Sequence, residues 1–131
     1  MRSRLCGVVV IAALAAASGA VAHPAGEARL AQRLEGRTAG KPVDCIRLRD
    51  VRGSEVIDGV AIVYEMPGGR LLVNRPRSGA SSLRSADILL TRSFAGELCA
   101  PQPIELIDSM SYFPRGFVSL GAFVPYAKPG R

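Results

Sequence analysis

The chain has 131 residues, 48% of them hydrophobic, and its 17 Lys and Arg outnumber its 11 Asp and Glu to give a net charge of +6. A chain of this length is enough for one small domain. The basic residues are scattered and interleaved with acidic ones, whereas a nucleic-acid-binding protein concentrates them on one element. We therefore expect no nucleic acid among its partners.

The first 22 residues have the layout of a secretory signal peptide. Arg2 and Arg4 give a basic start, Gly7–Ala17 is an unbroken apolar run, and Ala20-Val21-Ala22 is a small-x-small cleavage site. We expect a mature chain that begins at His23 and is periplasmic or secreted. The alternative is a membrane anchor, but the apolar run is about half of the roughly 20 residues that a span requires. We therefore expect no stable membrane span after cleavage.

The remaining chain divides into an N-terminal helix and linker at 23–42 and a β domain at 43–131. Because two arginines would leave with the signal and all 11 acidic residues would stay, the net charge would fall from +6 to +4. Good helix formers occupy Ala25–Glu35, with Gly36 as a stop. The apolar stripe of this helix is narrow, so we expect it either to pack lightly on the domain or to fray.

Cys45 and Cys99 are the two cysteines of the expected mature chain, because Cys6 lies within the signal peptide. An oxidising compartment favours their pairing. They lie far apart in sequence with no histidine near them, which suits neither a Cys-x-x-Cys redox pair nor a zinc site with short ligand spacing. We expect a structural disulfide, no metal and no cofactor.

Short apolar runs separated by turn residues predict β structure after Val43. Glu55–Ile57 and Val60–Glu65 flank Asp58-Gly59, a pair suited to a tight hairpin turn, and Val60 shares a predicted face with Ile62. Further strands are predicted at Ile46–Arg49, Arg70–Arg75, Ile88–Ser93, Ile104–Ser109 and Phe117–Val124, the last cut short by Pro125. We expect a mainly β fold: a single small antiparallel β-meander or partly open barrel of about six or seven strands, with a short N-terminal helix and one disulfide.

Several short motifs follow one another along the chain: Cys45-Ile46-x-Leu48, Val56-Ile57-Asp58-Gly59, Val73-Asn74-Arg75, Leu98-Cys99 and Leu120-Gly121-x-Phe123. In these motifs and their order, the segment from Val43 to Tyr126 resembles a group of small exported proteobacterial proteins with no assigned function. Members of that group often carry two further cysteines, at the positions of Ala80 and Val118 here. The resemblance supports the Cys45–Cys99 pairing and implies a second disulfide that this chain lacks. It implies no activity.

The expected mature chain offers few groups for catalysis. Its single histidine is His23; a copper site there would need a second imidazole, so we interpret this residue as part of a disordered leader. Without another histidine, a Ser-His-Asp or Cys-His nucleophile is excluded. Asp108 is the acidic residue that we expect to be partly buried, but the spacing of the acidic residues singles out no partner for hydrolysis by two carboxylates.

Two segments are candidates for binding. Arg75 and Arg77 lie close together in a predicted loop, where two guanidinium groups would suit a carboxylate or phosphate; the simpler interpretation is a solvated loop. Tyr112, Phe113 and Arg115 combine aromatic rings with an arginine, a composition common at protein interfaces. The alternative for the rings is a place in the core.

The sequence therefore predicts a non-catalytic, exported binding or structural domain. We expect a monomer whose partner is an envelope protein or an anionic ligand. The alternatives are a small carboxylate-dependent hydrolase and a secreted inhibitor. Two adjacent buried acids in a cleft would favour the hydrolase, a rigid exposed loop between the disulfide arms would favour the inhibitor, and an exposed apolar patch around Phe113 would favour the binding domain.

Overall fold

A computed structural model describes residues 23–130, and the signal peptide expected at 1–22 lies outside the described residues. This part of the chain forms one α-helix, ten strands and three short 3-10 turns. They are α1 (Pro24–Arg33), β1 (Thr38–Ala39), β2 (Cys45–Arg47), η1 (Leu48–Asp50), β3 (Gly53–Ile57), β4 (Ala61–Glu65), η2 (Pro67–Gly69), β5 (Leu71–Asn74), η3 (Ala80–Ser82), β6 (Asp87–Leu90), β7 (Glu97–Cys99), β8 (Pro103–Asp108), β9 (Pro114–Ser119) and β10 (Phe123–Ala127).

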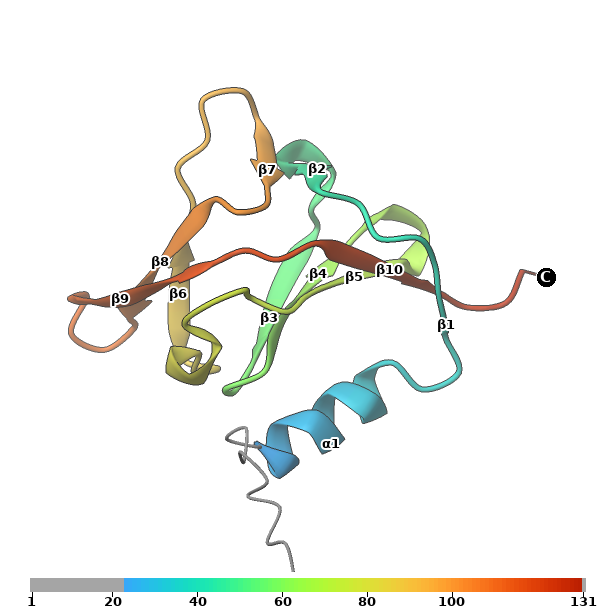
Figure 1. Ribbon diagram of the computed structural model, residues 1–131, viewed down its shortest axis with the longest axis horizontal. Helices are drawn as coiled ribbons and strands as arrows, with labels where there is room; N and C mark the ends of the chain where they lie inside the picture. The colour runs from blue at the N-terminus through green and yellow to red at the C-terminus, as the bar shows by residue number, and fades with distance from the viewer. Residues whose placement is uncertain (1–22, 131) are drawn as a thin grey trace, which may run out of the picture.

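The strands form three antiparallel sheets around one main core (Figure 1). The largest has the order β1-β10-β5-β4-β3, and the others are β2-β7 and β6-β8-β9. Apolar side chains from all three sheets meet in a single cluster, which includes Ile46, Val56, Ile62, Tyr64, Leu72, Leu98, Ile104, Leu106, Val118 and Phe123. The predicted mainly β, antiparallel fold is confirmed.

The helix α1 covers the other face of the five-stranded sheet and lies below it in Figure 1. Leu30 is 2% exposed and packs in a second cluster with Val63 and Val73. At Gly26, an added Cβ would lie 2.5 Å from the Asp58 carbonyl oxygen, so the close approach of helix and sheet requires glycine here. The helix is therefore a packed layer of the domain, although it ends at Arg33, earlier than the sequence predicts.

Ion pairs reinforce this packing at the helix surface. Arg29 donates to Glu55 at 2.9 Å, and Arg33 contacts both Glu55, at 3.1 Å, and Glu65, at 2.7 Å. Glu55 is on β3 and Glu65 is the last residue of β4, so the pairs join the helix to two neighbouring strands. Partly exposed pairs of this kind are each worth about 1 kcal/mol or less, so the apolar contacts of Leu30 remain the main attachment.

The interpretation of His23 as part of a disordered leader is wrong. His23 precedes α1 as its N-cap residue, and its carbonyl oxygen accepts the Glu27 N–H at 2.9 Å. Its ring packs on Gly59, where an added Cβ would lie 2.7 Å from the imidazole. Gly59 also has a φ of +68°, which the tight turn between β3 and β4 needs. The start of the expected mature chain is thus fixed against the first hairpin.

The strand β4 lies inside the five-stranded sheet, between β3 and β5, and is buried on both faces. Ile62 and Tyr64 point into the main core, while Ala61 and Val63 point toward α1. The sequence predicts that Val60 shares the face of Ile62, but Val60 lies in the turn before the strand and packs on the helix side. The strand therefore reads as a continuous apolar run, as expected where both faces are covered.

The C-terminal strand predicted at Phe117–Val124 is in fact two strands. The chain leaves the β6-β8-β9 sheet after Ser119, passes through Leu120-Gly121-Ala122, and joins the five-stranded sheet as β10. Pro125 does not end this strand. The Pro125 carbonyl oxygen accepts the Gly40 N–H, so the backbone nitrogen of Pro125 also faces the side of β1, just beyond the end of that two-residue strand. The missing N–H of proline therefore costs no hydrogen bond to β5, on the other side.

The ten strands exceed the predicted six or seven because several are very short. β1 lies inside the predicted linker, β2 ends at Arg47 and passes into a 3-10 turn, and β7 has three residues. β6 ends at Leu90, before the predicted Ser93. Strands of two or three residues show no alternation of their own, and they exist here because a neighbouring strand is already in place.

Asn74 holds the two halves of the chain together from inside the protein. It is fully buried, its side-chain nitrogen donates to the Gly121 carbonyl at 2.7 Å, and its oxygen accepts the Gly121 N–H at 3.0 Å. Gly121 itself lies so close to the neighbouring strand that an added Cβ would sit 2.2 Å from the Arg75 carbonyl oxygen. The crossing between the sheets therefore depends on an amide at one position and a glycine at the other.

We expect Asn74→Ala to lower the free energy of unfolding by about 2–4 kcal/mol, because it leaves the buried N–H and carbonyl of Gly121 without partners. Gly121→Ala is expected to be similarly damaging through its clash with the Arg75 carbonyl. Urea unfolding measures both. Gly130→Ala is the matched control, because an added Cβ there meets no atom within 4 Å. Equal stability of Asn74→Ala and the parent would contradict the role assigned to this amide.

Candidate functional site

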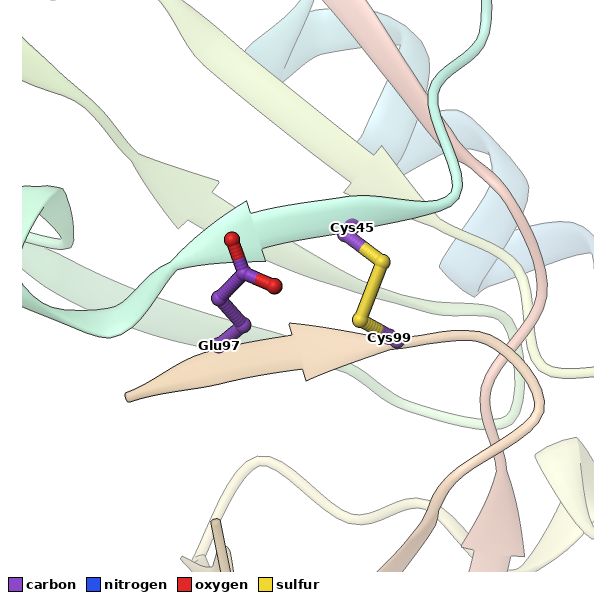
Figure 2. Close-up of side chains that lie close together, drawn as sticks. All are labelled: Cys45, Glu97 and Cys99. Carbon is purple, nitrogen blue, oxygen red and sulfur yellow. A yellow bond between two sulfur atoms is a disulfide. The ribbon is translucent and has the colours of Figure 1, made fainter. Parts of the chain in front are cut away.

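The disulfide joins two directly paired residues of the smallest sheet. Cys45 on β2 lies opposite Cys99 on β7, and their Sγ atoms are bonded at 2.18 Å. Figure 2 shows the carboxylate of Glu97 beside this bond. The Sγ atoms and a Glu97 oxygen lie within 4.8 Å of one another, a spacing that would suit a metal ion if the thiols were free. In the oxidised protein the two sulfurs are bonded to each other, so the group is structural.

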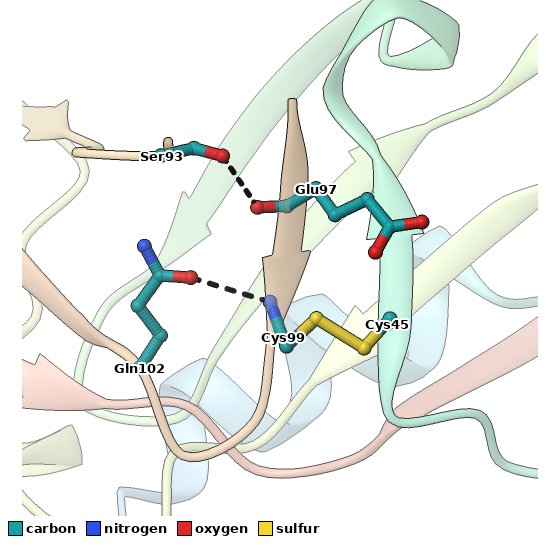
Figure 3. Close-up of a disulfide and its surroundings, with 5 residues drawn as sticks. All are labelled: Cys45, Ser93, Glu97, Cys99 and Gln102. Atoms are coloured by element: carbon teal, nitrogen blue, oxygen red, sulfur yellow. Dashed lines mark hydrogen bonds between the residues drawn. A yellow bond between two sulfur atoms is a disulfide. The ribbon is translucent and has the colours of Figure 1, made fainter. Parts of the chain in front are cut away.

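The loop at 91–96 rises above β7 and is anchored beside the disulfide (Figures 1 and 3). The Ser93 hydroxyl donates to the Glu97 carbonyl at 2.7 Å, and the Gln102 side-chain nitrogen donates to the Arg92 carbonyl. Gln102 also accepts the backbone N–H of Cys99, at 3.4 Å. These bonds hold the exposed side chain of Phe94 at the tip of an anchored loop.

Arg75, the first predicted binding residue, is engaged by the helix. Its two Nη atoms donate to the two carboxylate oxygens of Glu27 at 2.7 and 3.0 Å. The hydrogen bond from Arg75 lowers the pKa of Glu27, and the same bond raises the pKa of the Arg75 guanidinium. Arg75 therefore fastens α1 to the end of β5.

Arg77 is exposed and makes no side-chain hydrogen bond or ion pair to any residue in 23–130. Its backbone N–H donates to the Ser119 carbonyl at 2.8 Å, which fixes the 75–79 loop against the end of β9. The pair of guanidinium groups predicted from the sequence is thus divided, because one is neutralised by Glu27 and the other faces solvent.

Tyr112 and Phe113 are exposed at the tip of the β8–β9 hairpin. Asp108 shapes this tip: one of its carboxylate oxygens accepts the backbone N–H groups of Met110 and Ser111, at 3.0 and 2.8 Å, and the Ser111 hydroxyl at 2.9 Å. These bonds, from Ser111 above all, lower the pKa of the half-buried Asp108. The exposed rings are thus carried by a turn of defined shape, and neither ring belongs to the core.

Arg115 is bound internally. Its Nη1 contacts both oxygens of Asp87, at 2.6 and 2.5 Å, and its Nη2 approaches the Ser82 carbonyl at 3.4 Å. The Asp87 side chain is only 3% exposed. A register shift between Leu106 and Ile107 places Arg115 in a β-bulge, which turns its side chain out of the regular alternation of β9. Arg115 therefore ties β9 to β6 and η3.

The structure does not gather the predicted binding residues into one site. Arg77 is attached at Ser119, the last residue of β9, whereas Phe113 directly precedes the first; six residues of extended chain span about 20 Å. The positions equated above with further cysteines, Ala80 and Val118, lie on η3 and β9, which pack against each other.

The outer face of the β6-β8-β9 sheet forms an apolar surface that sequence reasoning missed. Leu90, Glu105 and Phe117 lie side by side across the three strands, and Ile88, Ile107 and Pro114 form the next row. Ile88, Leu90, Phe94 and Phe117 are exposed. A groove of about 930 Å³ runs between this face and the 91–96 loop, and its lining includes Leu90, Phe94, Pro103, Pro114 and Phe117. We call these five residues the apolar groove.

A signal for this groove is present in the sequence. Ile88 to Leu90 is apolar at every position, and Phe117 starts the last apolar run of the domain, so neither strand has the polar outward face of a half-buried sheet.

Among residues 23–130, no helix is long and apolar enough to cross a membrane.

Compared with protein-family profiles, with curated proteins and with solved structures, the chain gives no match.

We expect the double variant Cys45→Ser, Cys99→Ser to lose about 2–5 kcal/mol of unfolding free energy, the usual range for a native bridge in a small secreted domain. The bridge joins residues 54 positions apart, and the chain-entropy estimate for such a loop is about 4 kcal/mol. Urea unfolding with and without dithiothreitol measures the effect. The reduced parent should match the variant, and two free thiols titrating in the folded, unreduced parent would show that the bridge is absent.

We expect Arg75→Ala to destabilise the protein by about 1 kcal/mol or less, because the pair with Glu27 is solvent-exposed. The pKa of Glu27 is lower in the folded state, so the stabilisation is present above its ordinary value of 4.5 and is lost as the pH falls through the folded-state pKa. Urea unfolding should therefore separate parent and variant at about pH 7 and bring them together at about pH 2.5. A difference that stays constant over this range would show that Arg75 acts through packing.

Proposed function

We propose that this protein is an exported, non-catalytic binding domain whose contact surface is the apolar groove. The observation that carries the proposal is the outer face of the β6-β8-β9 sheet, where Leu90 and Phe117 stand exposed beside the anchored Phe94. A small monomeric domain normally presents polar side chains on such a face. Clustered exposed aromatic and aliphatic side chains are typical of surfaces that bind another protein.

The rim of the groove is polar and carries both signs of charge. Arg92, Glu97 and Gln102 line the side nearest the disulfide. Arg92 also forms an ion pair, at 3.5 Å, with Glu105, which lies on the central strand β8 between Leu90 and Phe117. An apolar centre with a mixed polar rim is the usual composition of a protein–protein interface. A lipid-binding surface would instead combine its apolar residues with a predominantly basic border.

The partner that fits is an extended polypeptide segment with apolar side chains, supplied by an envelope protein. β6 is an edge strand of its sheet, and within residues 23–130 no strand pairs with its outer edge. A segment that pairs with this edge would gain backbone hydrogen bonds and would place alternate side chains over the apolar face.

The two other functions predicted from the sequence have less support. Asp87 and Asp108 are paired in register on β6 and β8. However, the Asp87 carboxylate is bound by Arg115, and hydrogen bonds from the hairpin turn lower the pKa of Asp108. A hydrolase would need one acid with a raised pKa, so this pair favours a structural role. The 91–96 loop lies between the two cysteines in the sequence, as an inhibitor loop would. An inhibitor loop inserts into its target, whereas Phe94 of this loop lines a groove that can itself receive a side chain.

The experiment is in-cell photo-cross-linking with a photoreactive amino acid at position 117, in the lining of the groove. We expect this protein to be cross-linked to one discrete partner protein. We also expect the intact mass of the recovered chain to match a chain that begins at His23. Adding Phe94→Ser should reduce the cross-linked yield severalfold, since residues in the centre of an interface commonly contribute about 2 kcal/mol or more. The fold should be unaffected, because the Phe94 side chain is exposed.

Val43 provides the matched control, because it is an exposed apolar residue outside the groove. The photoreactive amino acid at position 43 should give no such product, and Val43→Ser should leave the yield at position 117 unchanged. Cross-links only between copies of this chain, or equal yields from positions 43 and 117, would contradict the proposal. Retention of residues 1–22 in the recovered chain would contradict the exported, soluble form.

A further inference from the structure

A second hollow, of about 490 Å³, lies where the C-terminal end of α1, the start of β3 and the β4–β5 turn meet. Its lining contains four arginines and one carboxylate: Arg33, Arg37, Arg52, Arg70 and Glu65. We call it the arginine pocket. These residues come from three separate stretches of the chain, so they form no basic run in the sequence.

The fold brings the arginines together through backbone contacts at the end of β4. The Arg52 N–H donates to the Glu65 carbonyl at 2.8 Å, and the Met66 N–H donates to the Arg70 carbonyl at 2.8 Å. Arg52 and Arg70 therefore flank the end of β4 on its two sides. Arg37 reaches the same place from the segment after α1, and its Nη1 donates to the Gly69 carbonyl at 2.6 Å.

The charges in this pocket are not balanced within the described chain. Arg33 is paired with Glu65 and Glu55, which uses the carboxylate of the pocket. Arg37 contacts only a neutral carbonyl. The exposed side chains of Arg52 and Arg70 make no hydrogen bond or ion pair to any residue in 23–130. Three guanidinium groups thus line one hollow with no carboxylate of residues 23–130 paired to them.

We propose that the arginine pocket binds a phosphate group, carried either by a soluble phosphate monoester or by the headgroup of an anionic lipid. Guanidinium groups bind phosphate oxygens in pairs, with two parallel N–H···O bonds, and several of them can share one phosphate. Three unpaired positive charges match a dianion better than a single carboxylate. The hollow is larger than a phosphate group, so it also has room for the group to which the phosphate is esterified.

The site is independent of the apolar groove, since the two hollows share no lining residue. It also differs from the arginine loop predicted from the sequence, in which Arg75 is already neutralised by Glu27. The anionic ligand expected for this protein is therefore assigned to other arginines than those that the sequence suggested.

The test is isothermal titration of the exported protein with glycerol 3-phosphate, at constant ionic strength, with acetate as the carboxylate comparison. We expect saturable binding of glycerol 3-phosphate and at least tenfold weaker binding of acetate. Arg52→Ala with Arg70→Ala should weaken phosphate binding at least tenfold, by removing two charge-assisted donors. Arg47→Ala with Arg84→Ala is the matched control: it removes the same charge from exposed arginines outside the pocket and should change the affinity less than twofold.

Sedimentation with phosphatidylcholine vesicles, with and without phosphatidic acid, distinguishes the two sources of the phosphate. Binding to the phosphatidic acid vesicles alone, lost in Arg52→Ala with Arg70→Ala, assigns the pocket to a lipid headgroup; saturable binding of glycerol 3-phosphate assigns it to a soluble monoester. Thermal melts of both double variants should match the parent, because none of these side chains bonds to the fold. Absence of saturable binding in both assays, or an equal loss in the Arg47 and Arg84 control, would overturn the proposal.

Discussion

The buried amide of Asn74 is the contact on which the arrangement of the sheets depends. It satisfies both backbone groups of Gly121 at the point where the chain leaves one sheet and enters another. Without that contact, a chain segment crossing through the core would carry an unpaired N–H and carbonyl, a cost that few small domains can absorb. β9, which carries Phe117, and β10, which closes the large sheet, both keep their positions through this crossing. The position of the apolar groove therefore depends on Asn74, which lies outside the groove.

The sequence predicted the parts of the fold that are encoded by neighbouring residues. The helix after His23 and the hairpin around Asp58-Gly59 follow from local signals, and the structure contains both. Cys45 and Cys99 are 54 positions apart, and their pairing was predictable because they are the two cysteines of the expected mature chain. The contact between Asn74 and Gly121 spans 47 residues. Both belong to short motifs that were noted in the sequence, but a motif does not reveal which other motif it touches. Strands such as β1 and β7 were missed because they have too few residues to show a pattern of their own.

The candidate sites were harder to predict than the fold, because arginine is used here in two ways. Arg75 and Arg115, which the sequence suggested for binding, are consumed by Glu27 and Asp87 in holding elements together. Arg52 and Arg70 look like isolated surface residues in the sequence and become neighbours only when β3, β4 and β5 pair. Whether a guanidinium group is available to a ligand depends on which carboxylates the fold brings to it, and composition alone does not contain that information.

The place of β10 in the sheet has a consequence for how the chain folds as it is made. This strand is the last of the described strands, yet it lies inside the largest sheet, between β1 and β5 (Figure 1). A chain emerging from its N-terminus can form the β3-β4-β5 meander early, but one edge of β5 stays open and β1 has no partner until the final strand arrives. Long-range pairing of this kind is slow and leaves edges exposed to other chains. The five-stranded sheet is thus completed only when β10, the last of the described strands, has paired with both β1 and β5.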